Sequence, residues 1–218
     1  MALLYRAELR PEKLELLTGW LPTRPWYRGP AAPNLRRVAA FRFDDPAGEV
    51  GIETLIVQAA DGPLLQAPLT YRHAPLDGGD QWLLGTADHS VLGQRWVYDA
   101  CGDPVYISVL ANTIFTGASQ AEEFIEVDGR LERREPSMSV RGSGAQGAEG
   151  PTINALVRVV ENDPTRILTE SVELVLARIL DDTTGWQDSG DTSEQLTLTA
   201  TWSGQPTPLL LAHARALT

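Results

Sequence analysis

The sequence predicts an α+β protein, in which an antiparallel β-sheet with two helices is followed by a second, mostly antiparallel β subdomain. Three observations lead to this class. Several runs alternate apolar and polar residues, which is the period of β-strands. Short turn sequences separate these runs, as they do between strands of an antiparallel meander. Two other segments repeat their apolar residues at the spacing of a helix.

The first helix is expected in the segment PEKLELLTGWL, residues 11–21. Leu14, Leu17 and Leu21 recur at helical spacing. Pro11 suits the first helical position, where its missing N–H is no loss. The next segment, residues 22–34, is rich in proline and glycine, and we expect a loop there.

Five strands are expected after this loop, because the apolar period changes from helical to two. The turn sequences DDPAGE and DGP separate the first three of them. An antiparallel meander is the natural interpretation. The expected strands are residues 34–43, 50–59, 64–73, 81–89 and 94–100.

The second helix is expected to begin at Asp103 and Pro104. An aspartate at the N-cap accepts the free N–H groups of the first turn, and a proline at N1 has the right backbone angle. Gly117 suits the position just after the last turn. Ser108 and Asn112 lie four residues apart, outside the apolar face. That face consists of Ile107, Leu110, Ala111 and Ile114.

The second half of the chain is predicted to be mostly β. Residues 122–135 form a hairpin around Asp128-Gly129, a favoured type I′ pair. The glycine-rich stretch 137–151 is interpreted as a linker between a unit at 1–136 and a β-rich unit at 152–218. Residues 170–180 fit a strand or a helix, and their alternation favours the strand. The expected strands are 153–162, 166–180, 195–202 and 208–217, with an acidic loop at 181–194.

The charge of the chain excludes several classes of partner. The formal net charge is −11. No basic run is present, so we expect no binding to nucleic acid and none to an anionic membrane. The chain has no signal-peptide pattern and no run of 18 apolar residues, so we expect a cytoplasmic protein. Cys101 is the single cysteine, which excludes an intrachain disulfide.

Motifs of phosphoryl transfer and hydrolysis are missing. Lys13 is the single lysine, and it follows Glu12 instead of the glycine that a P-loop requires. None of the three histidines is followed two residues later by aspartate, and no Asp-x-Glu occurs, so the parts of a kinase-like site are absent. No G-x-S-x-G occurs either. We therefore expect no catalytic activity of these types and no cofactor.

The stretch WVYDACGDPVYISVLANTIFTG contains the strongest candidates for chemistry. Asp99, Cys101 and Asp103 lie within five residues of one another. Cys101 with His89 could act as a nucleophile and base, and the two aspartates could act as an acid–base pair. The alternative interpretation is structural: a buried cysteine before a helix, and an aspartate that caps it. The histidines are isolated, so we expect no metal site.

The aromatic loop near residue 26 is a second candidate site. Trp26 and Tyr27 lie in a proline-rich loop, where such rings can stack on sugars. The alternative is that they fill the end of a sheet or a seam between subdomains. We name Trp26, Tyr27, Arg28, Asp99 and Asp103 as candidate ligand-binding residues.

Three segments in the same order resemble the N-terminal cap of actinobacterial maltokinases. They are ELLTGWLPTRPWYRG (15–29), LLQAPLTYRHAPL (64–76) and WVYDACGDPVYISVLANTI (96–114). The resemblance extends over roughly residues 1–120. It implies a curved antiparallel sheet with two flanking helices, which in maltokinases precedes the kinase core. It also implies that Asp103 and Pro104 begin a helix and that Asp99 braces the preceding turn.

The resemblance implies a function without catalysis. Maltokinases phosphorylate maltose with ATP in the route from trehalose to α-glucan, using residues downstream of the cap. This chain lacks those motifs, so no catalytic residue is carried over. We expect a stand-alone, cap-like protein that binds or regulates a sugar kinase or a glucan-metabolising enzyme. The alternatives are a small-molecule binder that takes a sugar, and an accessory cap that completes a sugar kinase in trans.

Overall fold

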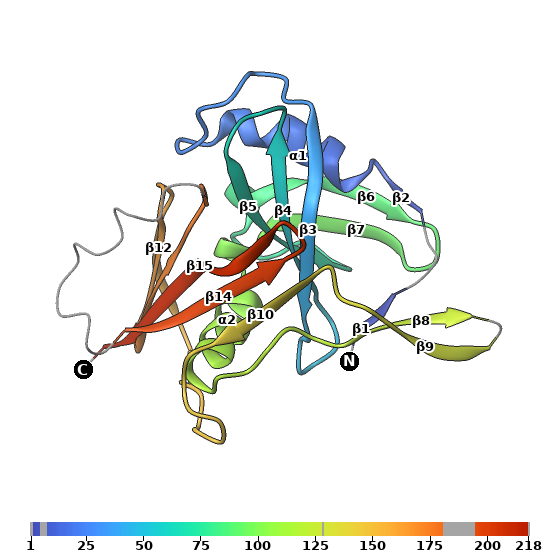
Figure 1. Ribbon diagram of the computed structural model, residues 1–218. Helices are drawn as coiled ribbons and strands as arrows, with labels where there is room; N and C mark the ends of the chain where they lie inside the picture. The colour runs from blue at the N-terminus through green and yellow to red at the C-terminus, as the bar shows by residue number, and fades with distance from the viewer. Residues whose placement is uncertain (1, 5–7, 128, 181–194, 218) are drawn as a thin grey trace.

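The structure is a computed structural model that describes residues 2–4, 8–127, 129–180 and 195–217. In this part of the chain, two six-stranded sheets and one three-stranded sheet pack with two α-helices, as the predicted α+β class requires (Figure 1). The helices are α1 (Lys13–Trp20) and α2 (Pro104–Phe115). Three single 3₁₀ turns occupy Leu21–Thr23, Asp80–Trp82 and Ala100–Gly102.

The first sheet has the strand order β2-β6-β7-β5-β4-β3, and every pair in it is antiparallel. It contains the five strands expected from the alternating pattern, with bounds that differ by one or two residues. Helix α1 lies against one face and α2 on the other side (Figure 1). The strands are β2 (Leu9–Arg10), β3 (Leu35–Phe43), β4 (Gly51–Ala59), β5 (Leu64–Arg72), β6 (Leu83–His89) and β7 (Gly93–Asp99).

Helix α1 begins two residues later than Pro11 predicts. Glu12 is the N-cap, and it forms a capping box with Glu15. The Glu12 side chain accepts the backbone N–H of Glu15, and the Glu15 side chain accepts the backbone N–H of Glu12. This reciprocal arrangement gives hydrogen-bond partners to two backbone N–H groups that would otherwise have none. A proline at the first helical position only removes one such N–H group. The expectation that Pro11 occupies the first helical position is therefore wrong.

Helix α2 confirms its predicted start and end. The Asp103 side chain accepts a hydrogen bond from the Val105 N–H at 3.0 Å, and Pro104 is the first helical residue. Gly117 has a φ of +63°, the left-handed conformation that ends a helix without a steric penalty for glycine. The buried side chains of α2 include the four that were predicted as its apolar face.

The second sheet has the order β10-β14-β15-β13-β12-β11, again with antiparallel pairs throughout. Its first strand lies inside the stretch 137–151, so that stretch is not irregular throughout. The predicted strand 166–180 is a hairpin of two strands. The bounds are β10 (Met138–Gly142), β11 (Leu156–Val160), β12 (Thr165–Thr169), β13 (Val172–Leu176), β14 (Leu196–Trp202) and β15 (Gln205–Ala216). The predicted acidic loop 181–194 lies outside the described residues.

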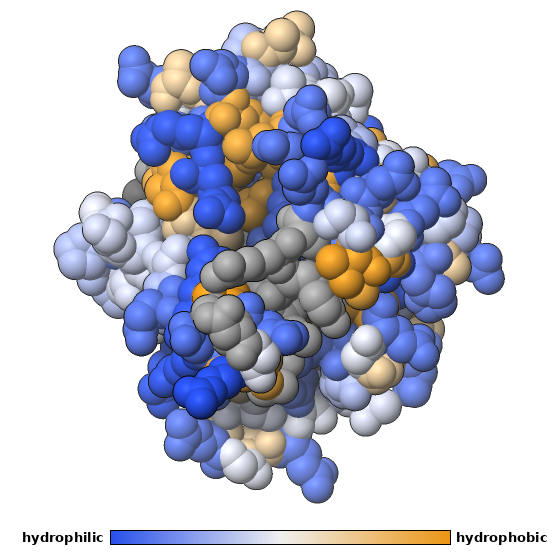
Figure 2. All heavy atoms as spheres, turned by 90° about the vertical axis from the view of Figure 1, so that its right-hand side faces the viewer, coloured by the Kyte–Doolittle hydropathy of each residue, from blue (hydrophilic) through white to orange (hydrophobic). Residues whose placement is uncertain are grey.

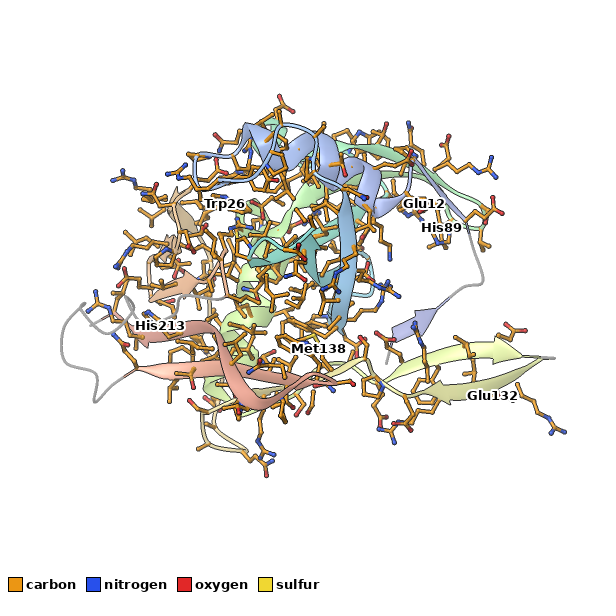
Figure 3. All side chains as sticks on the ribbon, turned by 45° about the horizontal axis from the view of Figure 1, so that its top comes forward. Glu12, Trp26, His89, Glu132, Met138 and His213 are labelled. Carbon is orange, nitrogen blue, oxygen red and sulfur yellow. The ribbon has the colours of Figure 1, made fainter. Side chains whose placement is uncertain are left out.

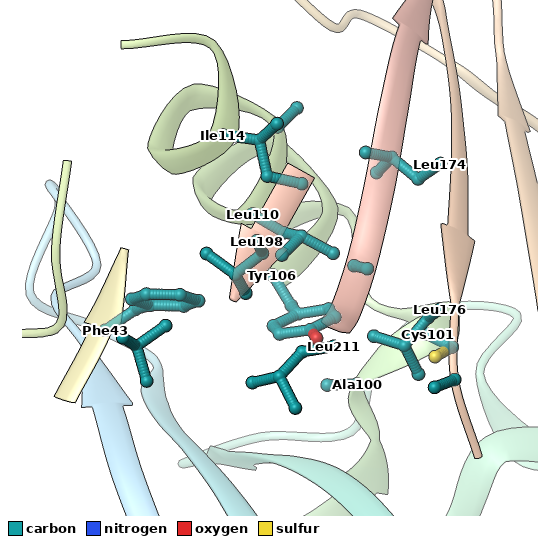
Figure 4. Packing of buried hydrophobic residues seen from close by; sticks show 14 of the residues in the cluster. Phe43, Ala100, Cys101, Tyr106, Leu110, Ile114, Leu174, Leu176, Leu198 and Leu211 are labelled. Carbon is teal, nitrogen blue, oxygen red and sulfur yellow. The ribbon is translucent and has the colours of Figure 1, made fainter. Parts of the chain in front are cut away.

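Buried apolar side chains gather on both faces of the first sheet. One cluster, under α1, includes Leu17 and Trp20 with inward residues of β4 and β5. The larger cluster joins the other face of the sheet to α2 and the second sheet, and Tyr106, Leu110 and Leu211 meet at its centre (Figure 4). The first sheet is therefore a middle layer, and the units expected at 1–136 and 152–218 share one core.

The third sheet forms an arm that extends away from this packed body (Figure 1). Its order is β1-β8-β9, from β1 (Ala2–Leu4), β8 (Glu123–Val127) and β9 (Arg130–Arg134). The hairpin confirms the prediction for 122–135, although Asp128 lies outside the described residues. The side of the molecule that carries the arm is largely hydrophilic, and its hydrophobic residues show as separate patches (Figure 2).

Candidate functional site

The main candidate site is an open groove of about 760 Å³ along the outer side of α2. One wall is the turn after β3, a second is α2 itself, and a third is the segment that leads into β8. A volume of this size falls in the range of small-molecule and peptide sites. The lining residues are Phe43–Ala47, Pro104, Val105, Ser108, Val109, Asn112, Thr113, Ser119–Glu122 and Pro151.

The outer face of α2 supplies polar groups to this groove. Ser108 and Asn112, which lie outside the apolar face in the sequence pattern, both line it. The Ser108 hydroxyl donates to the Pro104 carbonyl at 2.9 Å, so its oxygen can still accept a bond from a ligand. Asn112 is exposed and offers both an amide donor and an acceptor. These groups suit a polar partner that also contacts the apolar surface of Val105 and Val109.

The turn after β3 is a firm wall because Asp45 organises its backbone. The Asp45 carboxylate accepts hydrogen bonds from the N–H groups of Ala47, Glu49 and Val50 at 2.9–3.0 Å. Such side-chain bonds fix a turn in one conformation. The groove therefore has a pre-formed rim, which carries negative charge from Asp45 and from Glu122 on the facing wall.

Asp99 forms a fully buried ion pair, and it takes no part in the groove. Its Oδ2 lies 2.6 Å from Nη2 of Arg178, and both side chains are 0% exposed. Its Oδ1 accepts the Cys101 N–H at 3.3 Å, so Asp99 braces the turn before α2, as the resemblance implies. Burial alone would lower the pKa of Arg178, but the Asp99 carboxylate outweighs this effect and raises that pKa above its ordinary value.

Asp103 is likewise committed to structure. Besides capping α2, its two carboxylate oxygens accept bonds from Nε and Nη2 of Arg72 at 2.7 and 2.6 Å. This bidentate pair joins β5 to the start of α2. The side chain of Asp103 is 0% exposed. Neither aspartate presents a carboxylate to solvent for acid–base chemistry.

The structure does not bring Cys101 and His89 together. His89 pairs with Gly93 at the first residue of β7, whereas Cys101 follows the last residue of that strand. The Cys101 thiol is buried in the large core cluster (Figure 4), and burial raises its pKa well above the ordinary value. A protonated, inaccessible thiol is a poor nucleophile. The hypothesis of a Cys101–His89 pair is therefore wrong.

The aromatic loop is part of the core under α1. The Trp26 side chain is 2% exposed and meets Trp20 edge to face, with ring centroids 6.2 Å apart. The Arg178 guanidinium lies 5.0 Å from the Trp26 ring centroid. Tyr27 is 9% exposed, and only Arg28 is open to solvent. Neither ring offers a face to a sugar, because packed side chains cover both, and none of the five candidate residues lines the groove.

A buried polar cluster on the α1 side of the first sheet has no counterpart in the sequence predictions. The Glu53 carboxylate lies 2.6 Å from Lys13 Nζ and 3.0 Å from Arg42, and it accepts the Tyr71 hydroxyl at 3.0 Å. Burial would raise the pKa of Glu53, but the two cations and the hydrogen bonds lower it to about 2. The single lysine of the chain is therefore engaged in a structural ion pair.

Residues 20–103 match the family model of the maltokinase N-terminal cap domain. The match begins at the end of α1, contains β3 to β7 and ends at the N-cap of α2. It confirms the resemblance to a cap, over a shorter range than the predicted 1–120 and well under half of the chain. No protein with a curated description matches. The groove combines the β3–β4 turn of this cap-like segment with α2 and residues that follow it.

Two absences among the described residues bear on function. None of the helices in this part of the chain is long and apolar enough to cross a membrane. No three or more His, Cys, Asp or Glu side chains in the described ranges converge so that they could hold a metal ion. The open groove is a feature of this part of the chain that could hold a ligand.

Proposed function

We propose that this chain is a non-catalytic, cap-like protein that binds a sugar kinase or a glucan-metabolising enzyme through the groove along α2. The observation that carries the proposal is the match of residues 20–103 to the maltokinase cap model, in a chain whose candidate catalytic residues all serve the fold. The link to sugar and glucan metabolism comes from the name of that family.

The geometry of the groove supports binding to a protein. Its walls come from three parts of the chain, its rim is fixed by Asp45, and α2 contributes apolar residues to its lining. The Asp45 carboxylate on the rim favours a partner segment that carries a basic residue beside an apolar one, whereas Glu122 on the facing wall already pairs with Arg133. Interfaces commonly combine an apolar centre with a polar rim in this way.

A sugar is the second candidate ligand, because the same groove also has the size and polar groups of a small-molecule site. Ser108 and Asn112 supply a hydroxyl and an amide group, and Val105 and Val109 supply the apolar surface that a pyranose ring covers. This location replaces the aromatic loop, whose rings are buried.

The experiment is capture of purified maltokinase and of other sugar kinases by the immobilised chain, with calorimetry against maltose, trehalose and short glucans in parallel. Ser108→Arg places a long cation in the groove and should abolish binding to whichever partner uses it. Ser203→Arg makes the same change at the exposed turn between β14 and β15 and should bind like the wild type. Circular dichroism of both variants checks that they fold.

The outcomes separate the candidates. Retention of an enzyme by the wild type but not by Ser108→Arg supports the proposal. If the chain also increases the turnover of a kinase that lacks its own cap, it acts as an accessory cap in trans. Sugar binding that Ser108→Arg removes, without enzyme retention, supports the second candidate. Equal binding by both variants, or no binding to any enzyme or sugar, rules out the groove as the site.

A further inference from the structure

The arm offers a free sheet edge, and its charge pattern determines what can pair with it. Strand β9 is the last strand of the sheet β1-β8-β9, so none of the described strands lies beside the backbone groups on its outer side. All five of its residues are exposed. Leu131 is 52% exposed, one of the most exposed large apolar side chains of the described residues. Unpaired edges of this kind readily add another strand.

The charges along β9 divide into two groups. Near the base of the arm, Arg133 pairs with Glu122 at 3.0 Å and Arg134 with Glu123 at 3.6 Å. The two charged residues that flank Leu131, Arg130 and Glu132, differ from these pairs because they form no such ion pair among the described residues. Neither Arg130 nor Glu132 has a side-chain hydrogen bond or ion pair among the described residues, and Glu132 lies on the arm away from the packed body (Figure 3).

We propose that β9 pairs antiparallel with β9 of a second copy of this chain, with Leu131 on the two-fold axis. In this register Leu131 lies opposite the Leu131 of the second copy. Arg130 lies opposite the second copy's Glu132, and Glu132 opposite its Arg130. Directly opposed residues share a face of an antiparallel sheet, and opposite charges at such positions attract. Both side chains left without partners in one copy thus obtain one.

Other registers of self-pairing are less favourable. Centring the pair on Glu132 would oppose Glu132 to itself and Arg130 to Arg134, and like charges directly opposite are destabilising. A shift by one residue would oppose Arg130 to Arg133, which lie on opposite faces of the strand and cannot be directly opposed around a two-fold axis through the sheet. A strand from another protein would need an acid, an apolar residue and a base in the matching order. An antiparallel second copy has this order because it presents the same three residues in reverse.

The position of Leu131 also keeps the two bodies apart. It lies two residues after Gly129, near the tip of the hairpin, so the directly opposed residues run from 129 to 133, which is most of β9 but none of the packed body. Because the two β9 strands run antiparallel, the bases of the two arms lie at opposite ends of the strand pair. The two packed bodies are therefore expected on opposite sides of the paired arms. The sheet β1-β8-β9 of each copy continues into the same sheet of the other copy.

The overlap is short, so the expected dimer is weak and reversible. Interfaces well under about 1,200 Å² belong to transient complexes. Sedimentation of the full chain between about 10 μM and 1 mM, where binding of a few kcal/mol becomes visible, should show the average mass rising with concentration. This inference does not rest on the groove, although Glu122 lines the groove and also pairs with Arg133 at the base of the arm, so either proposal can fail without the other.

Charge exchange tests the register. Glu132→Arg opposes two arginines twice in each dimer and should weaken association at least tenfold. The double variant Arg130→Glu/Glu132→Arg restores opposite charges across the axis and should associate like the wild type. Glu149→Arg applies the same charge change to an exposed loop and serves as the matched control. Failure of the double variant to recover, or equal association by Glu132→Arg and the control, overturns the proposal.

Cross-linking supplies a second readout that does not need a tight dimer. In a Leu131→Cys variant the two new cysteines face each other at roughly 5 Å between Cβ atoms, close enough for a disulfide. An Arg134→Cys variant places them about six residues apart along the strands, roughly 20 Å, and should cross-link far more slowly. The native Cys101 is buried and does not compete. A strictly monomeric wild type with equal cross-linking at both positions would overturn the dimer.

Discussion

Replacing Asp99 by asparagine should destabilise the chain more than an average core substitution. The change keeps the size of the side chain and the oxygen that accepts the Cys101 N–H, and it removes the negative charge. Arg178 would then carry an uncompensated charge in the core. Its remaining contacts are the Thr165 hydroxyl at 2.8 Å and the face of Trp26. Its Nη1 has no hydrogen-bond partner among the described residues.

The expected loss follows from burial. Both side chains are 0% exposed and their charged atoms are 2.6 Å apart. Breaking a buried pair by removing one partner costs about 3–5 kcal/mol, because the remaining charge has neither water nor a counterion. With a urea m-value of about 2–3 kcal/mol/M for a small protein, the unfolding midpoint should fall by roughly 1.5 M.

A double variant separates the charge from the packing. In Asp99→Leu/Arg178→Met the buried charges disappear together, and well-packed hydrophobic replacements of buried pairs are often nearly neutral. The double variant should therefore be more stable than Asp99→Asn. Equilibrium urea unfolding, followed by circular dichroism and tryptophan fluorescence, measures the stability of each. A loss below about 1 kcal/mol for Asp99→Asn would refute the reasoning, because it is the cost of an ordinary surface-like change.

Three further predictions concern other parts of the chain. Because the pKa of Glu53 is lowered from 4.5 to about 2, its ionised form should contribute roughly 3 kcal/mol to the free energy of unfolding above pH 4.5. This contribution should be lost as the pH falls towards 2. Urea titrations at several pH values should show the loss in the wild type and not in Glu53→Gln, and the same pH dependence in both would contradict it. Cys101 should react with a thiol reagent at least ~100-fold more slowly in the native chain than in urea, since burial raises its pKa and blocks access; equal rates would mean that the thiol is open. A Cβ at Gly142 would lie 2.1 Å from the Thr113 carbonyl oxygen, so Gly142→Ala should cost about 2–3 kcal/mol, whereas Gly19→Ala, with open space in α1, should stabilise by up to ~1 kcal/mol; the reverse order in thermal unfolding would contradict the close approach of β10 to α2.

Local signals predicted the local structure well. The start of α2 was predictable because a cap and an N1 proline act within a few residues of each other, and the strands of the first sheet because their side chains alternate. The hairpin β12–β13 was predicted as one strand, since its turn at Glu170-Ser171 lacks glycine and proline. Its backbone is held instead by the Thr169 hydroxyl, which accepts the Ser171 and Val172 N–H groups at 3.3 and 2.8 Å.

The ion pairs and the groove depend on long-range contacts that the sequence does not reveal. Arg178 and Asp99 are 79 positions apart, and Glu53 meets Lys13 from 40 positions away. A weaker signal was present, because each of Glu53 and Arg178 interrupts an apolar strand-like run, and a charge buried in such a run must be paired. That pattern predicts the existence of a partner but not its identity. The groove has no such signal, since its walls come from separate segments.

The buried pair also bears on what the cap-like segment can do by itself. Residues 20–103 supply Asp99 and one face of the large core, but Arg178, α2 and the second sheet supply the rest. Cut off at residue 103, the segment would expose that face to water and leave Asp99 without its cation. In this chain α2 and the second sheet cover that face. The partner enzyme that we propose would then approach elsewhere, and the groove along α2, which combines the cap-like segment with residues that follow it, is open for such an approach.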